Sequence, residues 1–103
     1  MTINSYQKEA FTTAKPESQN INYMALGLAG EAGEVANKVK KVMRDGTELN
    51  VPDIMSELGD VLWYVAGMAT ILGIPLADIA EGNLAKLYDR KQRGTLGGSG
   101  DNR

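Results

Sequence analysis

Two long segments of this chain repeat apolar residues at the spacing of an α-helix, and each segment also carries a pair of acids. The first pair, Glu31 and Glu34, lies within Gly-Glu-Ala-Gly-Glu, and the second, Glu57 and Asp60, lies within Glu-Leu-Gly-Asp. Residues three positions apart are neighbours on one helix face, so the two acids of each pair point the same way. The sequence therefore predicts two long helices, each with acids beside an apolar stripe.

The apolar stripes are placed by a step of about 100° per residue around the helix axis. The predicted stripes consist of Met24, Leu28, Val35, Val39 and Val42 in the first helix, and of Ile54, Leu58, Val61, Val65 and Leu72 in the second. If these stripes pack together, the acids on their flanks meet. Carboxylates gathered at a half-buried interface repel one another, so a Lys or Arg side chain or a divalent metal must lie among them. Carboxylate ligands favour Mg²⁺ or Mn²⁺.

Capping residues and turn residues predict an all-α fold, a helical bundle without strands. The expected helices span about residues 5–14, 21–44, 52–72 and 75–92. Asn4 or Ser5 is expected to cap the first helix and Asn20 the second, because short polar side chains accept hydrogen bonds from free N–H groups at a helix start. Glycine dominates the segment after Arg93, so we expect one domain over residues 1–93 and a flexible tail over 94–103.

Composition excludes several kinds of chemistry. The chain has no cysteine and no histidine, which excludes thiol nucleophiles, Ser-His-Asp triads, disulfide scaffolds and ordinary zinc sites. A net charge of −2 argues against a nucleic-acid partner. The polar start does not read as a signal peptide, and the most apolar run, residues 61–75, is shorter than the roughly 20 residues that span a bilayer. We therefore expect a cytoplasmic protein with no membrane partner.

The last expected helix carries a row of amide and cationic side chains. This row consists of Asn83, Lys86, Arg90 and Arg93. Ammonium and guanidinium groups match phosphate oxygens, so the row suits polyphosphate binding. A solvated helix face is the alternative interpretation. The tail after the row could fold over a bound anion.

Two longer motifs add a family resemblance. Gly-Leu-Ala-Gly-Glu-Ala-Gly-Glu-Val-Ala at 27–36, followed by Ser-Glu-Leu-Gly-Asp-Val-Leu-Trp-Tyr at 56–64, closely resembles the MazG-like branch of the all-α nucleoside triphosphate pyrophosphohydrolases. The hallmark of that family is E-x-x-E, a variable gap and E-x-x-D. The resemblance covers about residues 20–93 and implies hydrolysis of a nucleoside triphosphate between the α and β phosphates, which gives a monophosphate and pyrophosphate. Housekeeping of the nucleotide pool is the expected role, and the preferred base and sugar stay open.

The resemblance implies a role for the four acids, and the kinds of residue present suggest roles for others. The family's four acids bind Mg²⁺, and here they correspond to Glu31, Glu34, Glu57 and Asp60. Because the chain has no histidine, a proton released by the attacking water must pass to a carboxylate or stay with the metal, and Glu34 is the expected acceptor. The expected substrate-binding residues are Lys38, Lys41, Tyr64, Asn83, Lys86 and Arg90. Trp63 is expected to serve packing or a subunit interface.

Two further expectations concern assembly and alternatives. The helix at 52–72 is apolar nearly all round, so we expect a second copy to cover it and to complete a four-helix bundle as a homodimer or homotetramer. The family's members work as dimers or tetramers, in agreement with this expectation. The main alternative function is a non-catalytic helical module whose acids bind a basic partner. A phosphatase that acts on the terminal phosphate is the other alternative.

Overall fold

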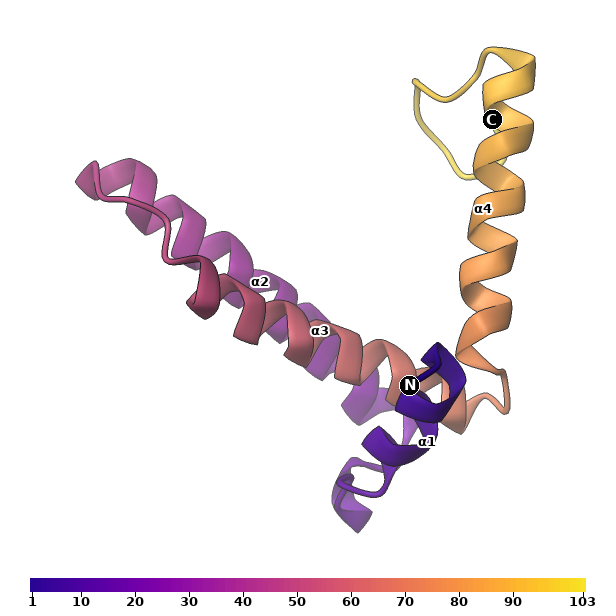
Figure 1. The fold of residues 1–103 in the computed structure, drawn as a ribbon, viewed down its shortest axis with the longest axis horizontal. Coiled ribbons are helices and arrows are strands. Elements are labelled where there is room, and N and C mark those ends of the chain that lie inside the picture. The colour runs from indigo at the N-terminus through magenta and orange to yellow at the C-terminus, as the bar shows by residue number, and fades with distance from the viewer.

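The computed structural model describes all 103 residues, which form four α-helices, one short 3-10 helix and no strand (Figure 1). The elements are α1 (Ile3–Phe11), η1 (Pro16–Ser18), α2 (Ile21–Asp45), α3 (Val51–Ile71) and α4 (Leu76–Arg93). Helices α2 and α3 lie side by side as a long hairpin, and α1 packs across the end of α3. The chain then bends by 104° into α4, which stands away from the hairpin. The all-α prediction is confirmed.

Capping residues explain most of the helix limits. The side chain of Asn20 accepts a hydrogen bond from the Tyr23 amide at 2.8 Å, as predicted for the start of α2. Gly46 follows α2 with φ of 66°, a left-handed conformation that glycine adopts without the steric penalty of a side chain. The first helix differs from the prediction, because Thr2 and not Asn4 or Ser5 is its cap.

Local hydrogen bonds account for the different limits of α1. The Thr2 hydroxyl accepts from the Ser5 amide at 3.0 Å, and the Ser5 hydroxyl accepts from the Thr2 amide at 2.8 Å. This reciprocal pair satisfies two free amides and starts the helix earlier than expected. At the other end, the hydroxyls of Thr12 and Thr13 bond back to the carbonyls of Glu9 and Ala10, so α1 ends at Phe11 and not near residue 14.

Two glycines allow α2 and α3 to approach closely. A Cβ atom on Gly27 would lie 2.0 Å from the Tyr64 ring, and one on Gly67 would lie 2.6 Å from the methyl group of Met24. Met24 is fully buried at this contact. Glycine inside a helix costs about 1 kcal/mol relative to alanine, and the close contact explains why the chain carries that cost at these positions.

The face of α3 that packs on α2 is not the stripe that periodicity predicts. Leu58 and Leu72 were expected in that stripe, yet they are 52% and 56% exposed. The side chains or backbone of Glu57, Tyr64 and Gly67 contact α2 instead. Because α3 is apolar on most of its circumference, periodicity alone does not determine which side meets α2.

Polar side chains of α1 hold the corner where α3 turns into α4. The Gln7 side chain is buried, and its amide nitrogen donates to the Ile74 carbonyl at 2.9 Å while its oxygen accepts from the Leu76 amide at 2.7 Å. The Trp63 indole donates to the Thr13 hydroxyl at 2.8 Å, so this side chain packs on the end of α1. These contacts fix α1 and the first turn of α4 relative to α3.

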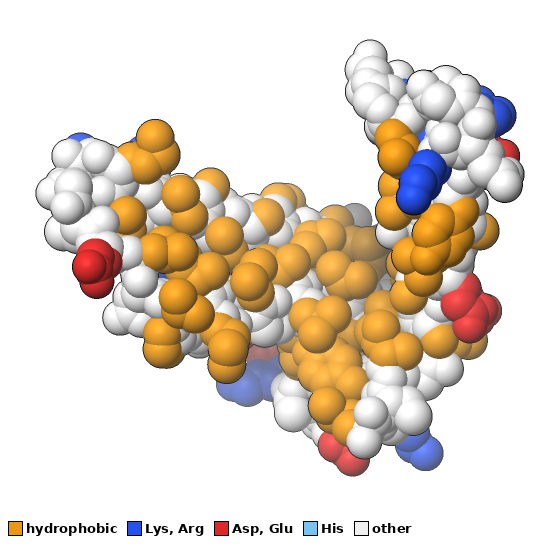
Figure 2. All heavy atoms as spheres, turned by 45° about the horizontal axis from the view of Figure 1, so that its top comes forward, with side chains coloured by type: hydrophobic (Ala, Val, Ile, Leu, Met, Phe, Trp, Pro, Cys, Tyr) orange, Lys and Arg blue, Asp and Glu red, His pale blue; other side chains and the backbone are white.

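The single chain is open and exposes much apolar surface. Its radius of gyration is 16.2 Å, whereas a compact chain of this length is expected near about 13 Å. Large apolar side chains on all three long helices are exposed, among them Leu26, Met43, Met55, Leu62, Ile79, Leu84 and Tyr88. Figure 2 shows hydrophobic side chains spread over the α2–α3 arm and along one side of α4. Exposed apolar patches of this extent mark interaction surfaces.

Two further features are the position of the tail and the length of the apolar helices. Residues 94–103 fold back beside α4, where the carboxyl terminus lies, and the flexibility of this tail stays a prediction. No single helix is long and apolar enough to cross a membrane, although α3 and α4 together pass on length and composition as a bent pair.

The helix contact at Gly27 gives the first prediction. Gly27→Ala should lower the free energy of unfolding by about 1–3 kcal/mol, because a methyl group would overlap the rigid Tyr64 ring. Gly30→Ala on the same helix is the matched control, since nothing lies within 4 Å of its Cβ position, and it should raise stability by about 0.5–1 kcal/mol. Urea denaturation followed by circular dichroism measures both. Equal stabilisation by the two substitutions would refute the contact.

Candidate metal centre

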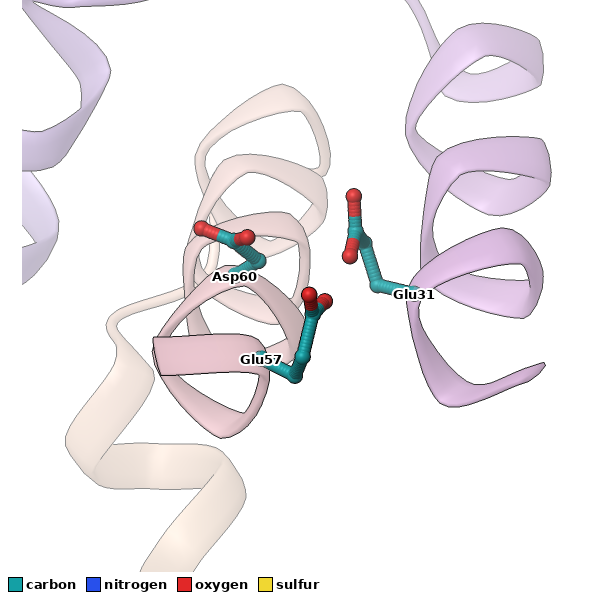
Figure 3. Close-up of side chains that lie close together, drawn as sticks. All are labelled: Glu31, Glu57 and Asp60. Atoms are coloured by element: carbon teal, nitrogen blue, oxygen red, sulfur yellow. The ribbon is translucent and has the colours of Figure 1, made fainter. Parts of the chain in front are cut away.

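Three carboxylates from two helices face one another in the middle of the hairpin (Figure 3). Glu31 belongs to α2, and Glu57 and Asp60 belong to α3. One oxygen of each lies within 4.8 Å of the others. The spacing of three residues puts Glu57 and Asp60 on one face of α3, and the packing of the hairpin places that face opposite Glu31. The predicted meeting of the two acidic segments is therefore present for these three side chains.

Glu34, the fourth predicted ligand, is exposed and does not belong to this group of three. Three residues along a helix turn the side chain by about 60° from that of Glu31, toward solvent. Its negative charge still contributes to raising the pKa of Glu31, as the smallest of the causes. The roles of Glu34 as a ligand and as a proton acceptor stay predictions.

Glu31 is the member of the cluster whose surroundings oppose its negative charge. Its pKa is raised, first by a hydrogen bond with the neighbouring Glu57 carboxyl group, then by burial and by the negative charges of Asp60, Glu57 and Glu34. Its Oε2 atom is buried and has no hydrogen-bond partner. A buried carboxylate oxygen without a partner costs free energy, which a cation would recover. The three acids thus fit a hard divalent cation, for which carboxylate oxygens are the preferred ligands.

A lysine neutralises the other side of the cluster. The Lys38 ammonium lies 2.7 Å from Asp53 Oδ1 and 3.0 Å from Glu57 Oε1. The hydrogen bond from Lys38 lowers the pKa of Glu57, while Asp53 and Glu57 raise the pKa of Lys38. Lys38 was predicted to bind the triphosphate, and in this structure its ammonium group is paired with Asp53 and Glu57. Sequence reasoning did not identify Asp53 as its partner, although Asp53 precedes Glu57 by one helical turn.

Tyr64 connects the acids to a polar cavity. Burial and the nearby Tyr23 raise the pKa of Tyr64, as do the charges of Glu31 and Asp60. The Trp63 ring meets the Tyr64 ring edge-on, with centroids 4.9 Å apart. A cavity of about 280 Å³ is lined by Thr13, Lys15, Glu17, Ser18, Tyr23, Trp63 and Tyr64. Tyr64 was expected to reach a ligand, and its position is compatible with that role.

Sequence reasoning did not foresee this cavity. Its walls come from the segment between α1 and α2, from Tyr23 in the first turn of α2, and from the aromatic pair on α3. Thr13 and Trp63, which are bonded to each other, lie fifty residues apart in the chain. No local pattern signals such a contact, because it depends on how α1 packs against α3.

The remaining predicted substrate-binding residues lie away from the three acids. Lys41 is exposed near the turn between α2 and α3, where it lines a cavity of about 270 Å³. Asn83, Lys86 and Arg90 lie on α4, which makes no contact with α2 and leads away from the hairpin (Figure 1). Lys86 and Arg90 instead bind Asp101 of the tail. One chain alone does not bring the cationic row to the acids.

Comparison with known proteins gives the family. The sequence matches the family model of the MazG nucleotide pyrophosphohydrolase domain over residues 19–95, which include all four predicted metal ligands. It is also 51% identical over 89 residues to the Gene 37 protein of Mycobacterium phage L5, an alignment that covers 82% of this chain and 78% of that protein. No solved structure matches the chain significantly. The acidic helices, their all-α setting and this match together show that the chain belongs to the MazG nucleotide pyrophosphohydrolase family.

Proposed function

We propose that this protein is a Mg²⁺-dependent nucleoside triphosphate pyrophosphohydrolase that serves housekeeping of the nucleotide pool in the cytoplasm. Its substrate is cleaved between the α and β phosphates into a nucleoside monophosphate and pyrophosphate. Family membership supports the reaction class. The observation that carries the proposal is the convergence of Glu31, Glu57 and Asp60 around a buried, unpartnered carboxylate oxygen.

Each part of the site has a proposed task. Glu31, Glu57 and Asp60 hold Mg²⁺, or Mn²⁺ in its place, and exposed Glu34 completes the set. When bound, the divalent cation neutralises phosphate charge and makes a water molecule more acidic. The Glu34 carboxylate accepts the proton of the attacking water, since solvent reaches it and no histidine is available.

Other side chains support the acids and bind the nucleotide. Lys38 lowers the pKa of Glu57 through the 3.0 Å contact between them, which favours the charged form of Glu57 that a cation requires. Tyr64 lies beside the acids and also lines the cavity of about 280 Å³, so this cavity is the proposed place for the sugar or the base. Stacking on aromatic rings suits any nucleobase.

We also propose that the active form is a homodimer or a dimer of dimers. The exposed apolar surface of α2, α3 and α4 supports this proposal, because such surface is stable only when it is covered. Pairing of the two hairpins forms a four-helix bundle. In that assembly, the Asn83, Lys86 and Arg90 row of one copy reaches the acids of the other, which one chain does not achieve alone.

The metal proposal gives a stability prediction with a definite pH dependence. Because the pKa of Glu31 is raised on folding, the folded chain holds this proton more firmly than the unfolded chain, and stability falls as pH rises above the ordinary glutamate value of about 4.3. Glu31→Gln removes this penalty. In EDTA, the substitution should therefore raise the melting temperature at pH 7 and change it little at pH 4.

The same variant tests the cation. Mg²⁺ should raise the melting temperature of the unsubstituted protein at pH 7 and should not do so for Glu31→Gln. Glu9→Gln, at an exposed position of α1, is the control and should behave as the unsubstituted protein does. Equal stabilisation of all three by Mg²⁺, or a lower melting temperature of Glu31→Gln in EDTA at pH 7, would refute the site.

Product analysis tests the reaction. A panel of canonical and modified nucleoside triphosphates with Mg²⁺ should yield monophosphate and pyrophosphate, and Asp60→Asn should lower kcat/KM by at least about 100-fold with unchanged helical content. Asp78→Asn, on exposed α4 surface, is the matched control. Orthophosphate as the product would indicate a phosphatase. No turnover of any substrate would favour the non-catalytic module.

The assembly proposal predicts a mass of at least twice the 11.1 kDa of one chain in light scattering at micromolar concentration. Leu62→Lys places a charge on the exposed apolar surface, where it does not disturb the fold of one chain, because Leu62 is 42% exposed. This variant should dissociate and lose activity together. A fully active monomer would contradict the proposal.

A further inference from the structure

The glycine-rich tail forms a closed loop against α4, outside the part of the chain that matches the family. The loop is tied by the Arg103 guanidinium, which donates to the carbonyls of Thr95, Leu96, Gly97 and Gly100. At its base, the Thr95 amide donates to the Arg90 carbonyl at 2.8 Å. The family match ends at residue 95, so most of the loop lies outside the matched residues. This arrangement fixes where Asp101 lies.

Asp101 occupies the cationic pair on α4. Its Oδ1 atom lies 2.7 Å from the Lys86 ammonium and 3.1 Å from Nη2 of Arg90, which also donates to the Asp101 backbone carbonyl. These contacts lower the pKa of Asp101, with Lys86 as the larger cause and Arg90 next. A single oxygen that accepts from an ammonium and a guanidinium is bound as a phosphate oxygen would be.

The two sides of this contact differ in exposure. The Arg90 residue is 5% exposed, so it is closed to an outside ligand while the tail is in place. The Asp101 side chain is 76% exposed and keeps most of its water. The exposed pair with Lys86 contributes only about 0–1 kcal/mol, and Asp101 offers one negative charge, so a ligand with several negative charges can displace this aspartate.

We propose that Lys86 and Arg90 form an anion site for a phosphate group, and that Asp101 occupies it in the free protein. The tail then competes with a polyphosphate ligand and lowers its affinity until the ligand displaces the loop. The assignment of the ligand as the triphosphate of the substrate, or the pyrophosphate product, rests on the proposed function. The competition itself concerns binding only and does not require turnover.

Pyrophosphate binding in EDTA tests this competition without metal or catalysis. Asp101→Asn should bind pyrophosphate about three- to tenfold more tightly than the unsubstituted protein in isothermal titration calorimetry, because the ion pairs of Asp101 with Lys86 and Arg90 no longer oppose binding. Glu81→Gln removes the same charge from exposed α4 surface, where it makes no ion pair, and should leave Kd unchanged. Lys86→Gln, introduced into Asp101→Asn, should reverse the gain.

Backbone NMR of the unsubstituted protein adds a direct readout. Saturation with pyrophosphate should shift the amide signals of Gly100 and Asp101 as the loop leaves α4, and the same titration with a nonhydrolysable triphosphate should do so at lower concentration. Unchanged pyrophosphate affinity of Asp101→Asn, or tail signals that do not respond to saturating ligand, would overturn the inference and leave the proposed reaction standing. A gain in affinity without any nucleotide turnover would refute the reaction and support the anion site.

Discussion

Repulsion among carboxylates at the α2–α3 contact is the constraint on which the rest of the structure depends. Close packing at Gly27 and Gly67 holds the helices so that Glu31 faces Glu57 and Asp60. Lys38 compensates one side of this cluster, yet the Oε2 atom of Glu31 stays buried without a partner. A protein gains stability by removing such a group unless the group binds something. The uncompensated negative charge of this cluster therefore fits a site for a cation.

The open shape of one chain is the second physical theme. A hairpin of two long helices with a third helix at an angle of 104° cannot bury its own apolar surface. The same geometry keeps the cations of α4 apart from the acids of the hairpin. The proposed pairing of copies would cover the apolar surface and bring the cations of one copy to the acids of the other. Within one chain, Asp101 of the tail neutralises Lys86 and Arg90 of α4. In the proposed competition, a polyphosphate ligand takes its place.

Local signals allowed much of the fold to be predicted. The cap at Asn20 and the turn at Gly46 depend on neighbouring residues only, so sequence sufficed there. The rotation of α3 could not be predicted, because its apolar residues surround the axis and the expected stripe residue Leu58 is exposed. The buried glutamine of α1 shows the same limit, since nothing near Gln7 in the sequence predicts that its side chain accepts a hydrogen bond from the Leu76 amide at the start of α4.

In the candidate site too, local spacing predicted some features and helix packing determines the others. The spacing of Glu57 and Asp60 predicted that they share a face of α3. The packing of α2 on α3 places Glu31 opposite them. The exposed position of Glu34 and the ion pair of Lys38 with Asp53 depend on how the two helices are rotated and shifted against each other, which no short motif encodes.

The central claim is that a cation binds between the two helices, and Mn²⁺ anomalous diffraction from crystals of the protein tests it most directly. We expect one strong anomalous peak within coordination distance of Glu31, Glu57 and Asp60. A peak elsewhere, or none at saturating Mn²⁺, would contradict the account.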